Sequence, residues 1–143
     1  MSSAIGFRHP LDVRFFEVDS RGVVFNKGLP RLANEAMSAF IESIGYDLAT
    51  LRARLLDVVL RRAELEWLTS LQAFEHAEVA VRADHVGTTS FRLRFDIERV
   101  DGSGQVRTRC AQAAITYVCV EIAGRSTRPI LDGLLEALAG DCR

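Results

Sequence analysis

"LPRLANEAMSAFIESIG", residues 29–45, has the spacing of one long amphipathic helix. Apolar residues recur there at intervals of three and four, and polar residues fall on the opposite side, as on a helix with one buried face. Pro30 is typical of a first helical turn, where its missing N–H loses no hydrogen bond. Gly45 is typical of a helix end. The apolar positions of this predicted helix are Leu29, Ala33, Ala36, Met37, Phe40 and Ile44.

Alternation of apolar and polar residues indicates strands on both sides of this helix. Residues 11–18, LDVRFFEV, alternate before it, and SFRLRFDIERV is the clearest case after it. The short sequences GTT and DGSG between the later segments are typical of hairpin turns. The strands predicted after the helix are residues 58–68, 77–86, 90–100 and 105–122. A short second helix is expected within residues 46–55, and a closing helix within residues 129–140.

The order of these elements predicts an α+β domain. It runs from a strand through one long helix to four consecutive antiparallel strands, and the sheet must bury its apolar face against the helix by curling around it. The last predicted strand is apolar on both faces, whereas one helix covers only one face. We therefore expect a partner subunit and at least a dimer. The length of 143 residues fits a single domain, residues 1–143.

Composition narrows the class of protein further. Hydrophobic residues make up 48% and charged residues 26%, enough apolar material for a core. The net charge of -1 argues against nucleic-acid binding, which usually needs a basic excess. The N-terminus has no signal-peptide pattern, and no segment approaches the ~18 apolar residues of a membrane span, so we expect a cytoplasmic protein without a membrane span.

Cofactor and metal motifs are not found in the sequence. The three cysteines, Cys110, Cys119 and Cys142, have no zinc-ligand spacing with one another or with histidine. We interpret the first two as buried apolar residues and Cys142 as a free thiol near the end. The sequence also contains no GxGxxG fingerprint and no phosphate-binding loop. We therefore expect chemistry that uses no metal and no organic cofactor.

Three segments carry a resemblance to a known family. They are VRFFEVDSRGVVFNKGLPRLANEAMSAFIESIGYDL, LRRAELEWLTSLQAFEHAEVAV and GTTSFRLRFDIERV. Together they resemble the hotdog-fold acyl-CoA thioesterases of the 4-hydroxybenzoyl-CoA thioesterase type, including relatives linked to the Tol-Pal operon. The most specific part matches the family block R-x-x-E-x-D-x-x-G-V-V, from Arg14 to Val24. The resemblance implies a long central helix wrapped by a curved antiparallel sheet, and a homodimer or homotetramer with active sites at the subunit interface.

The resemblance also assigns a catalytic carboxylate. In this family the aspartate of the block attacks the thioester as nucleophile or activates a water as general base, and Asp19 matches it. Thioester hydrolysis also needs donors for the oxyanion, and a helix start supplies unpaired N–H groups with partial positive charge. The amides from Asn26 to Gly28 are therefore the candidate oxyanion hole. Gly22 would allow a tight turn and a close approach of the backbone to the acyl chain.

Several candidate residues can be explained by a structural role as well as by a functional one. Asp19 and Asn26 can be capping residues. Glu35 lies on the predicted central helix, the element on which another hotdog branch carries its catalytic glutamate, although it falls on the polar side of that helix. Arg92 or Arg94 would be able to meet CoA phosphates. The expected substrate-binding residues are Gly22, Val23, Phe25, Glu35, Trp67, Thr89 and Ser90, of which Trp67 can equally be a packing residue and the last two an ordinary hairpin turn.

Hydrolysis of an acyl-CoA has three alternatives. Asn26 stands where many relatives carry histidine, which leaves open a non-catalytic acyl-CoA-binding protein. An acyl-carrier-protein thioester is an alternative substrate. A hydroxyacyl thioester dehydratase on this scaffold relies on a histidine paired with an acid, and no histidine lies near Asp19 in the sequence. The acyl group, and the choice between dimer and tetramer, stay open at this point.

Overall fold

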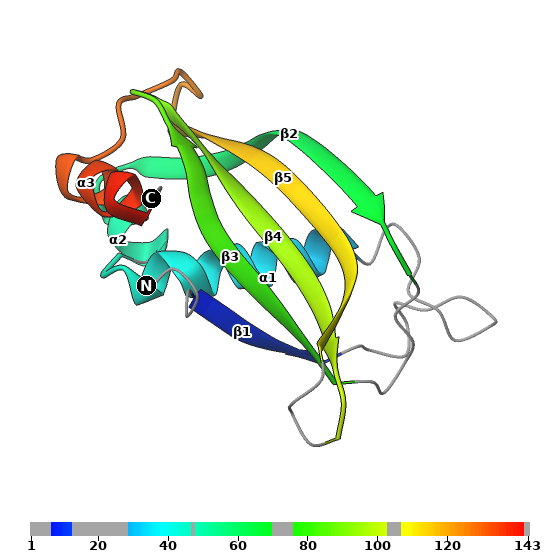
Figure 1. Ribbon diagram of the computed structural model, residues 1–143. Coiled ribbons are helices and arrows are strands. Elements are labelled where there is room, and N and C mark those ends of the chain that lie inside the picture. Colours follow the sequence, from blue (N-terminus) through cyan, green and yellow to red (C-terminus); the bar gives the residue numbers. More distant parts are fainter. Residues whose placement is uncertain (1–6, 13–28, 47, 70–75, 103–106, 142–143) are drawn as a thin grey trace.

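The computed structural model describes residues 7–12, 29–46, 48–69, 76–102 and 107–141. In it a curved five-stranded sheet passes over one long helix, α1 (Leu29–Ser43), and two shorter helices lie together near one end of the sheet (Figure 1). The shorter helices are α2 (Leu48–Ala53) and α3 (Asp132–Asp141). The strands are β1 (Phe7–Asp12), β2 (Leu56–Trp67), β3 (His76–Val86), β4 (Ser90–Val100) and β5 (Arg107–Glu121).

Helix α1 ends as the sequence predicts. Gly45 adopts a φ of 96°, a left-handed conformation that glycine reaches without the steric cost of a side chain. The N–H groups of Gly45 and Tyr46 then donate to the carbonyl oxygens of Glu42 and Ile41, at 3.0 and 3.1 Å. These bonds satisfy carbonyl groups that the helix end would otherwise leave unpaired. The chain can therefore turn directly from α1 toward α2.

The sheet is antiparallel throughout, with the strand order β1-β3-β4-β5-β2. The hairpins predicted from GTT and DGSG are correct, because β3 pairs with β4 and β4 pairs with β5. Strand β2 pairs with β5 at the opposite edge of the sheet, because β1 already occupies the free side of β3. This crossover places β1 and β2 at the two edges, and the helix connecting them lies across the sheet (Figure 1).

The core lies between the sheet and α1. Alternate residues of β4 are fully buried, and α1 contributes the apolar stripe predicted from its spacing. Cys110 and Cys119 are both buried, as predicted, whereas Cys142 lies outside the described residues. The principal core residues of these two elements are Ala36, Met37, Phe40 and Ile41 of α1 and Phe91, Leu93, Phe95 and Ile97 of β4.

The first strand begins earlier than the alternation indicated. We predicted a strand over residues 11–18, whereas β1 spans Phe7–Asp12 and contains Pro10. Proline cannot donate to a strand ladder, but it is tolerated in an edge strand, and β1 is one. Residues 13–18 lie outside the described residues.

The two-faced apolar pattern of β5 is partly accounted for within this chain. Val118 and Val120, on the face away from the core cluster, are both buried in the single chain. Residues after β5 fold back beside its end, where Val120 bridges to Thr127 and the Arg128 N–H donates to the Cys119 carbonyl at 2.9 Å. These two valines therefore need no partner subunit for their burial, and the expectation of an oligomer requires other support.

Tyr117 carries a buried hydroxyl that has no hydrogen-bond partner within the part of the chain that the structure describes. The residue is 1% exposed and stacks on Phe91 at 5.5 Å, and burial raises the pKa of its phenol. We expect Tyr117→Phe to stabilise the protein by ~1 kcal/mol, because a buried unpaired hydroxyl costs ~1–3 kcal/mol. Thermal unfolding should then shift upward by about 3 °C. The control is Tyr46→Phe at a half-buried tyrosine, and an equal or lower melting temperature for Tyr117→Phe would contradict the expectation.

Candidate functional site

The predicted catalytic block connects β1 to α1. Asp19, Gly22, Val23, Phe25 and Asn26 all fall within residues 13–28, outside the described residues. Their roles therefore stay predictions. The structure describes the two elements at which this segment begins and ends, the last residue of β1 and the first turn of α1.

A polar contact joins these two elements. The Nε2 atom of His9 on β1 lies 3.0 Å from the Oε2 atom of Glu35 on α1, a hydrogen bond from the ring to the carboxylate. His9 stands opposite Val79, which is fully buried, so its side chain lies on the side of the sheet that carries the core. Phe7 on the same face stacks on His9 and meets Phe40 of α1 edge-on.

Sequence reasoning placed Glu35 among the candidates but overlooked His9. The signal was present in the sequence, because Phe7 and His9 are two residues apart and face the same way in a strand. It was missed because the strand was predicted to begin at Leu11. Glu35 lies at the half-buried border of α1 rather than on a fully solvated face, with 38% of its side chain exposed.

Thr89 lies in the turn between β3 and β4, and Ser90 is the first residue of β4. Backbone carbonyl groups here have partners within the chain: the Thr89 carbonyl accepts from the Cys119 N–H at 2.8 Å, and the Ser90 carbonyl accepts from the Gly87 N–H at 2.7 Å. The Thr88 carbonyl accepts from the Ile130 N–H at 2.9 Å. The turn is thus tied to β5 and to the segment before α3.

Arg92 and Arg94 share one carboxylate on the outer face of the sheet. Both guanidinium groups bind Asp84, Arg92 through Nε at 2.7 Å. Burial by itself raises the pKa of the Asp84 carboxyl, but the hydrogen bonds and charges of the two arginines together lower it below its ordinary value. Their buried neighbours Phe91, Leu93 and Phe95 point to the core, so the arginines point away from α1. To bind CoA phosphates, these two arginines would have to exchange their contacts with the Asp84 carboxylate for contacts with phosphate.

Trp67 ends β2 at a point where the chain is held closely to β5. It is half-buried and packs against the core. The next two N–H groups, of Leu68 and Thr69, both donate to the Cys110 carbonyl, at 2.8 and 3.1 Å. This arrangement makes Trp67 a packing residue, and its contact with an acyl group stays a prediction.

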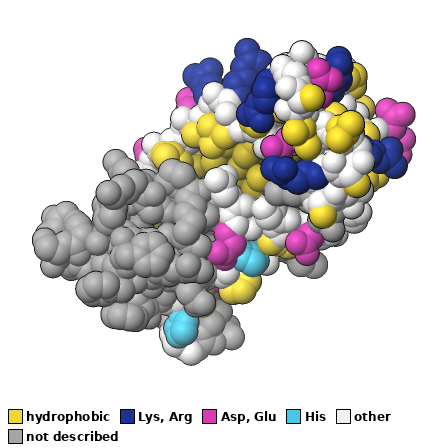
Figure 2. Space-filling model, turned by 180° about the vertical axis from the view of Figure 1, so that it is seen from behind, with side chains coloured by type: hydrophobic (Ala, Val, Ile, Leu, Met, Phe, Trp, Pro, Cys, Tyr) yellow, Lys and Arg dark blue, Asp and Glu magenta, His cyan; other side chains and the backbone are white. Residues whose placement is uncertain are grey.

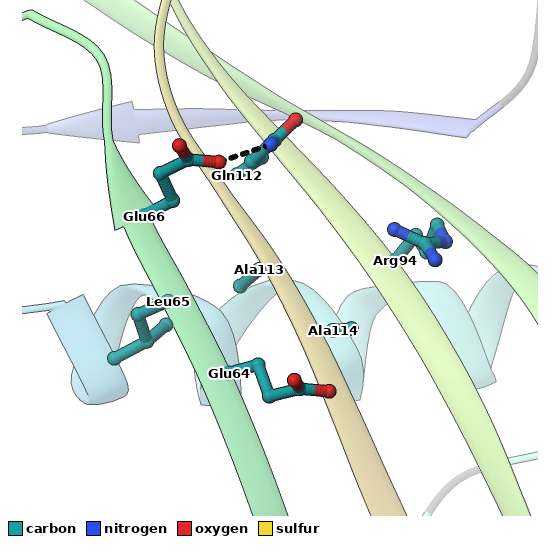
Figure 3. A pocket seen from close by; sticks show the side chains of 7 residues that line it. All are labelled: Glu64, Leu65, Glu66, Arg94, Gln112, Ala113 and Ala114. Carbon is teal, nitrogen blue, oxygen red and sulfur yellow. Dashed lines mark hydrogen bonds between the residues drawn. The ribbon is translucent and has the colours of Figure 1, made fainter.

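One hollow of about 320 Å³ lies over the strands on the side away from α1, which is seen behind the sheet in Figure 3. Its rim is polar, and the Gln112 Nε2 atom donates to the Glu66 Oε1 atom at 2.6 Å. The lining residues are Glu64, Leu65, Glu66, Arg94, Gln112, Ala113 and Ala114. A second cavity, of about 400 Å³, lies beside Tyr46, Arg54 and residues 129–133. Among the residues predicted to act in catalysis or to bind substrate, Arg94, a candidate for the CoA phosphates, lines the first cavity, and none lines the second.

Metal-ligand clusters and membrane-spanning helices are both absent from the described residues. Within them, no three or more His, Cys, Asp or Glu side chains gather closely enough to hold a metal ion. Across the same ranges, no helix has the length and apolar character needed to cross a membrane.

Comparison with known proteins identifies the fold and the family. Residues 13–138 match the Thioesterase-like superfamily. A curated relative, the 1,4-dihydroxy-2-naphthoyl-CoA hydrolase of Thermosynechococcus vestitus, is 26% identical over 123 residues, which cover 85% of this chain and 81% of the relative.

Two solved structures share the architecture. A 1,4-dihydroxy-2-naphthoyl-CoA thioesterase from Synechocystis aligns with a TM-score of 0.80 and 16% identity, over 93% of this chain and 95% of that one. A hypothetical protein from Staphylococcus aureus, solved in complex with CoA, aligns with a TM-score of 0.83 and 11% identity, over 95% of this chain and 83% of that one.

At these identities the structural likeness establishes the fold, and the sequence match establishes the family. The predicted hotdog architecture, a curved antiparallel sheet wrapped around a long helix, is confirmed. The prediction of a thioester hydrolase is confirmed at the level of the family. The chain belongs to the thioesterase-like superfamily.

Proposed function

We propose that this protein hydrolyses an acyl-CoA thioester to the free acid and CoA. The observation that carries the proposal is the family match over residues 13–138, which includes the Asp19 block and every strand after α1. In the reaction, the oxygen of water forms a new bond to the acyl carbon, and the bond from that carbon to sulfur breaks. One proton of water remains with the products on the carboxyl group, and the thiolate leaves as the thiol after taking up the other.

Asp19 is the proposed catalytic carboxylate, acting as nucleophile or as general base. Either role needs a donor for the oxyanion that forms on the thioester carbonyl. Helix α1 begins at Leu29, directly after the segment that contains Asn26. The first N–H groups of a helix have no partner inside the helix and carry partial positive charge, which supports the amides near Asn26 as the oxyanion hole.

An aromatic acyl group is the first substrate to test. The curated relative is named for a bicyclic aromatic acyl-CoA, and it spans 85% of this chain. Aliphatic acyl-CoAs should be tested beside it. The shape of an acyl pocket at a subunit interface depends on both copies of the chain, so one chain does not define which acyl group fits. Acyl-carrier-protein thioesters are the alternative class. They share the phosphopantetheine arm with CoA, and a comparison of the two carriers with the same acyl group separates them.

The proposal is tested by following free thiol release from aromatic and aliphatic acyl-CoAs with the purified protein. Turnover above the uncatalysed rate supports a thioesterase, and the ratio of kcat/KM values ranks the acyl groups. A second experiment measures equilibrium binding of a non-hydrolysable acyl-CoA analogue. Binding of the analogue with no turnover on any ester would favour the non-catalytic acyl-CoA-binding protein instead.

We further propose that the protein works as a homo-oligomer assembled through β2. This strand is 12 residues long, lies at the edge of the sheet, and faces no other strand on its outer side among the described residues. Leu60 and Leu65 stand opposite buried residues of β5 yet are 46% and 41% exposed. Exposed apolar side chains also gather on the face seen from behind in Figure 2.

The charges of β2 favour a second copy of the same chain as the partner. Arginines at positions 61 and 62 precede Ala63, and glutamates at positions 64 and 66 follow it. Antiparallel pairing of two copies about Ala63 would bring Arg62 of one copy opposite Glu64 of the other, and a two-fold axis repeats the contact. Such pairing would also satisfy the free N–H and C=O groups of an edge strand. A homotetramer would need a further contact between two such dimers.

A further inference from the structure

We infer that His9 is a positioning residue of the thioesterase site, acting through its hydrogen bond to Glu35. The bond holds β1 and α1 together on either side of the segment that carries Asp19. The inference rests on the proposed function, and it concerns a residue for which neither the sequence motif nor the family match suggests a role.

The location of the pair is the first argument. His9 lies ~10 Å before the end of β1, at about 3.3 Å per residue, and Glu35 lies ~9 Å after the start of α1, at about 1.5 Å per residue. The bond therefore joins the two elements within a short distance of the points where the segment of residues 13–28 begins and ends. A shift of β1 along α1 would move one end of that segment relative to the other.

The chemistry of the pair is the second argument. Two neighbours of His9 on this face are apolar, Phe7 on the same strand and Val79 on the next strand. Phe7 in turn meets Phe40 of the helix edge-on. An apolar side chain at position 9 would also pack β1 on α1, but it would allow β1 to slide along the helix. A hydrogen bond has a preferred length and direction, so a half-buried histidine and carboxylate fix the relative position of the two elements. Their side chains are 26% and 38% exposed.

The opposite face of β1 offers a matched control. Arg8 points to the outer face of the sheet, where it forms an ion pair with Glu98 of β4. That pair holds the same strand against the sheet but does not touch α1. Comparing the two pairs separates an effect on the position of β1 relative to α1 from an effect on the attachment of β1 to the sheet.

The experiment compares His9→Phe, His9→Gln and Arg8→Gln in the full-length protein, measuring kcat and KM with an acyl-CoA and the melting temperature. Phenylalanine keeps a ring against Phe7 and removes the N–H donor, whereas glutamine keeps a donor for Glu35. We expect His9→Phe to lower kcat by about 10- to 100-fold, the scale of a small misplacement of a catalytic group, with KM changed less than about threefold. His9→Gln should restore kcat to within about threefold of wild type, and Arg8→Gln should leave it within about twofold.

A second variant removes the same hydrogen bond from its other side, so that the test does not depend on the correct folding of His9→Phe alone. Glu35→Leu should reproduce at least the same loss of kcat, and the double variant with His9→Phe should lose no more than Glu35→Leu alone, because both changes remove the His9–Glu35 hydrogen bond. Equal kcat for His9→Phe and Arg8→Gln, or for His9→Phe and His9→Gln, would overturn the inference. If wild type turns over and Asp19→Asn does not, such a result overturns the inference alone. A wild type with no turnover would overturn the proposed function and this inference with it.

Discussion

Asp19→Asn should lower kcat for acyl-CoA hydrolysis at least ~100-fold, the scale on which positioned acid–base groups contribute. Asparagine has nearly the shape of aspartate, but it can neither accept a proton from water nor form an acyl intermediate through a carboxylate. The loss should therefore appear in kcat, with KM changed far less, because the side chain acts on the reacting carbonyl rather than on the CoA carrier. The measurement is steady-state thiol release with the best substrate of the panel.

The control for this variant is Glu17→Gln, which removes a carboxylate from the same block. We interpret Glu17 as structural, so this change should cost less than about tenfold in kcat, well below the effect of a lost acid–base group. Asp19→Asn with more than about a tenth of the wild-type kcat would contradict a catalytic role for Asp19. Equal losses in the two variants would point to a general disturbance of the block.

The double substitution of Leu60 and Leu65 by lysine should convert the oligomer to monomers and abolish most of the activity. The two leucines are the large exposed apolar residues on the core-facing side of β2. Two lysines on each copy would place four charges in the proposed contact, and burying charges without partners is costly. The mass of the protein in solution follows from light scattering or sedimentation. If active sites form between subunits, the monomeric variant should also lose kcat/KM by about 100-fold or more, because each site then lacks the residues that the second subunit contributes.

Leu55→Lys is the matched control for this prediction. Leu55 is 69% exposed, more than either β2 leucine, but it lies outside the strand. It should change neither the mass in solution nor the activity. A double variant that keeps the wild-type mass would exclude β2 as the contact, and one that becomes monomeric with full activity would place the whole active site within one chain.

Local patterns predicted most of the elements. The helix was found from its apolar spacing and from Gly45, and β3 and β4 differ from the predicted strands by at most one residue at an end. These features depend on residues a few positions apart, so periodicity is enough to find them. The early start of β1 was missed because Pro10 interrupts the alternation. Proline is compatible with this strand only because the strand is at an edge, which a pattern does not reveal.

Long-range contacts were the part that the sequence did not predict. The pairing of β2 with β5 joins Leu56 to Glu121, and no local signal distinguishes it from pairing with β3. The His9–Glu35 bond and the sharing of Asp84 by two arginines arise in the same way, from segments brought together by the sheet. The catalytic block itself was predicted through a resemblance, and its residues lie outside the described ones.

The most direct test of thioester hydrolysis is the mass of the acid product formed by wild type in water enriched in ¹⁸O. An aromatic acyl-CoA is incubated with the protein over many turnovers, and free thiol and acid are both quantified. We predict one acid for each thiol, with one ¹⁸O atom in its carboxyl group, because either attack by water or attack by Asp19 followed by water brings in a solvent oxygen over repeated turnovers. An acyl-CoA that is bound but recovered unchanged, with no labelled acid, would contradict the assignment of this chain as a working thioesterase.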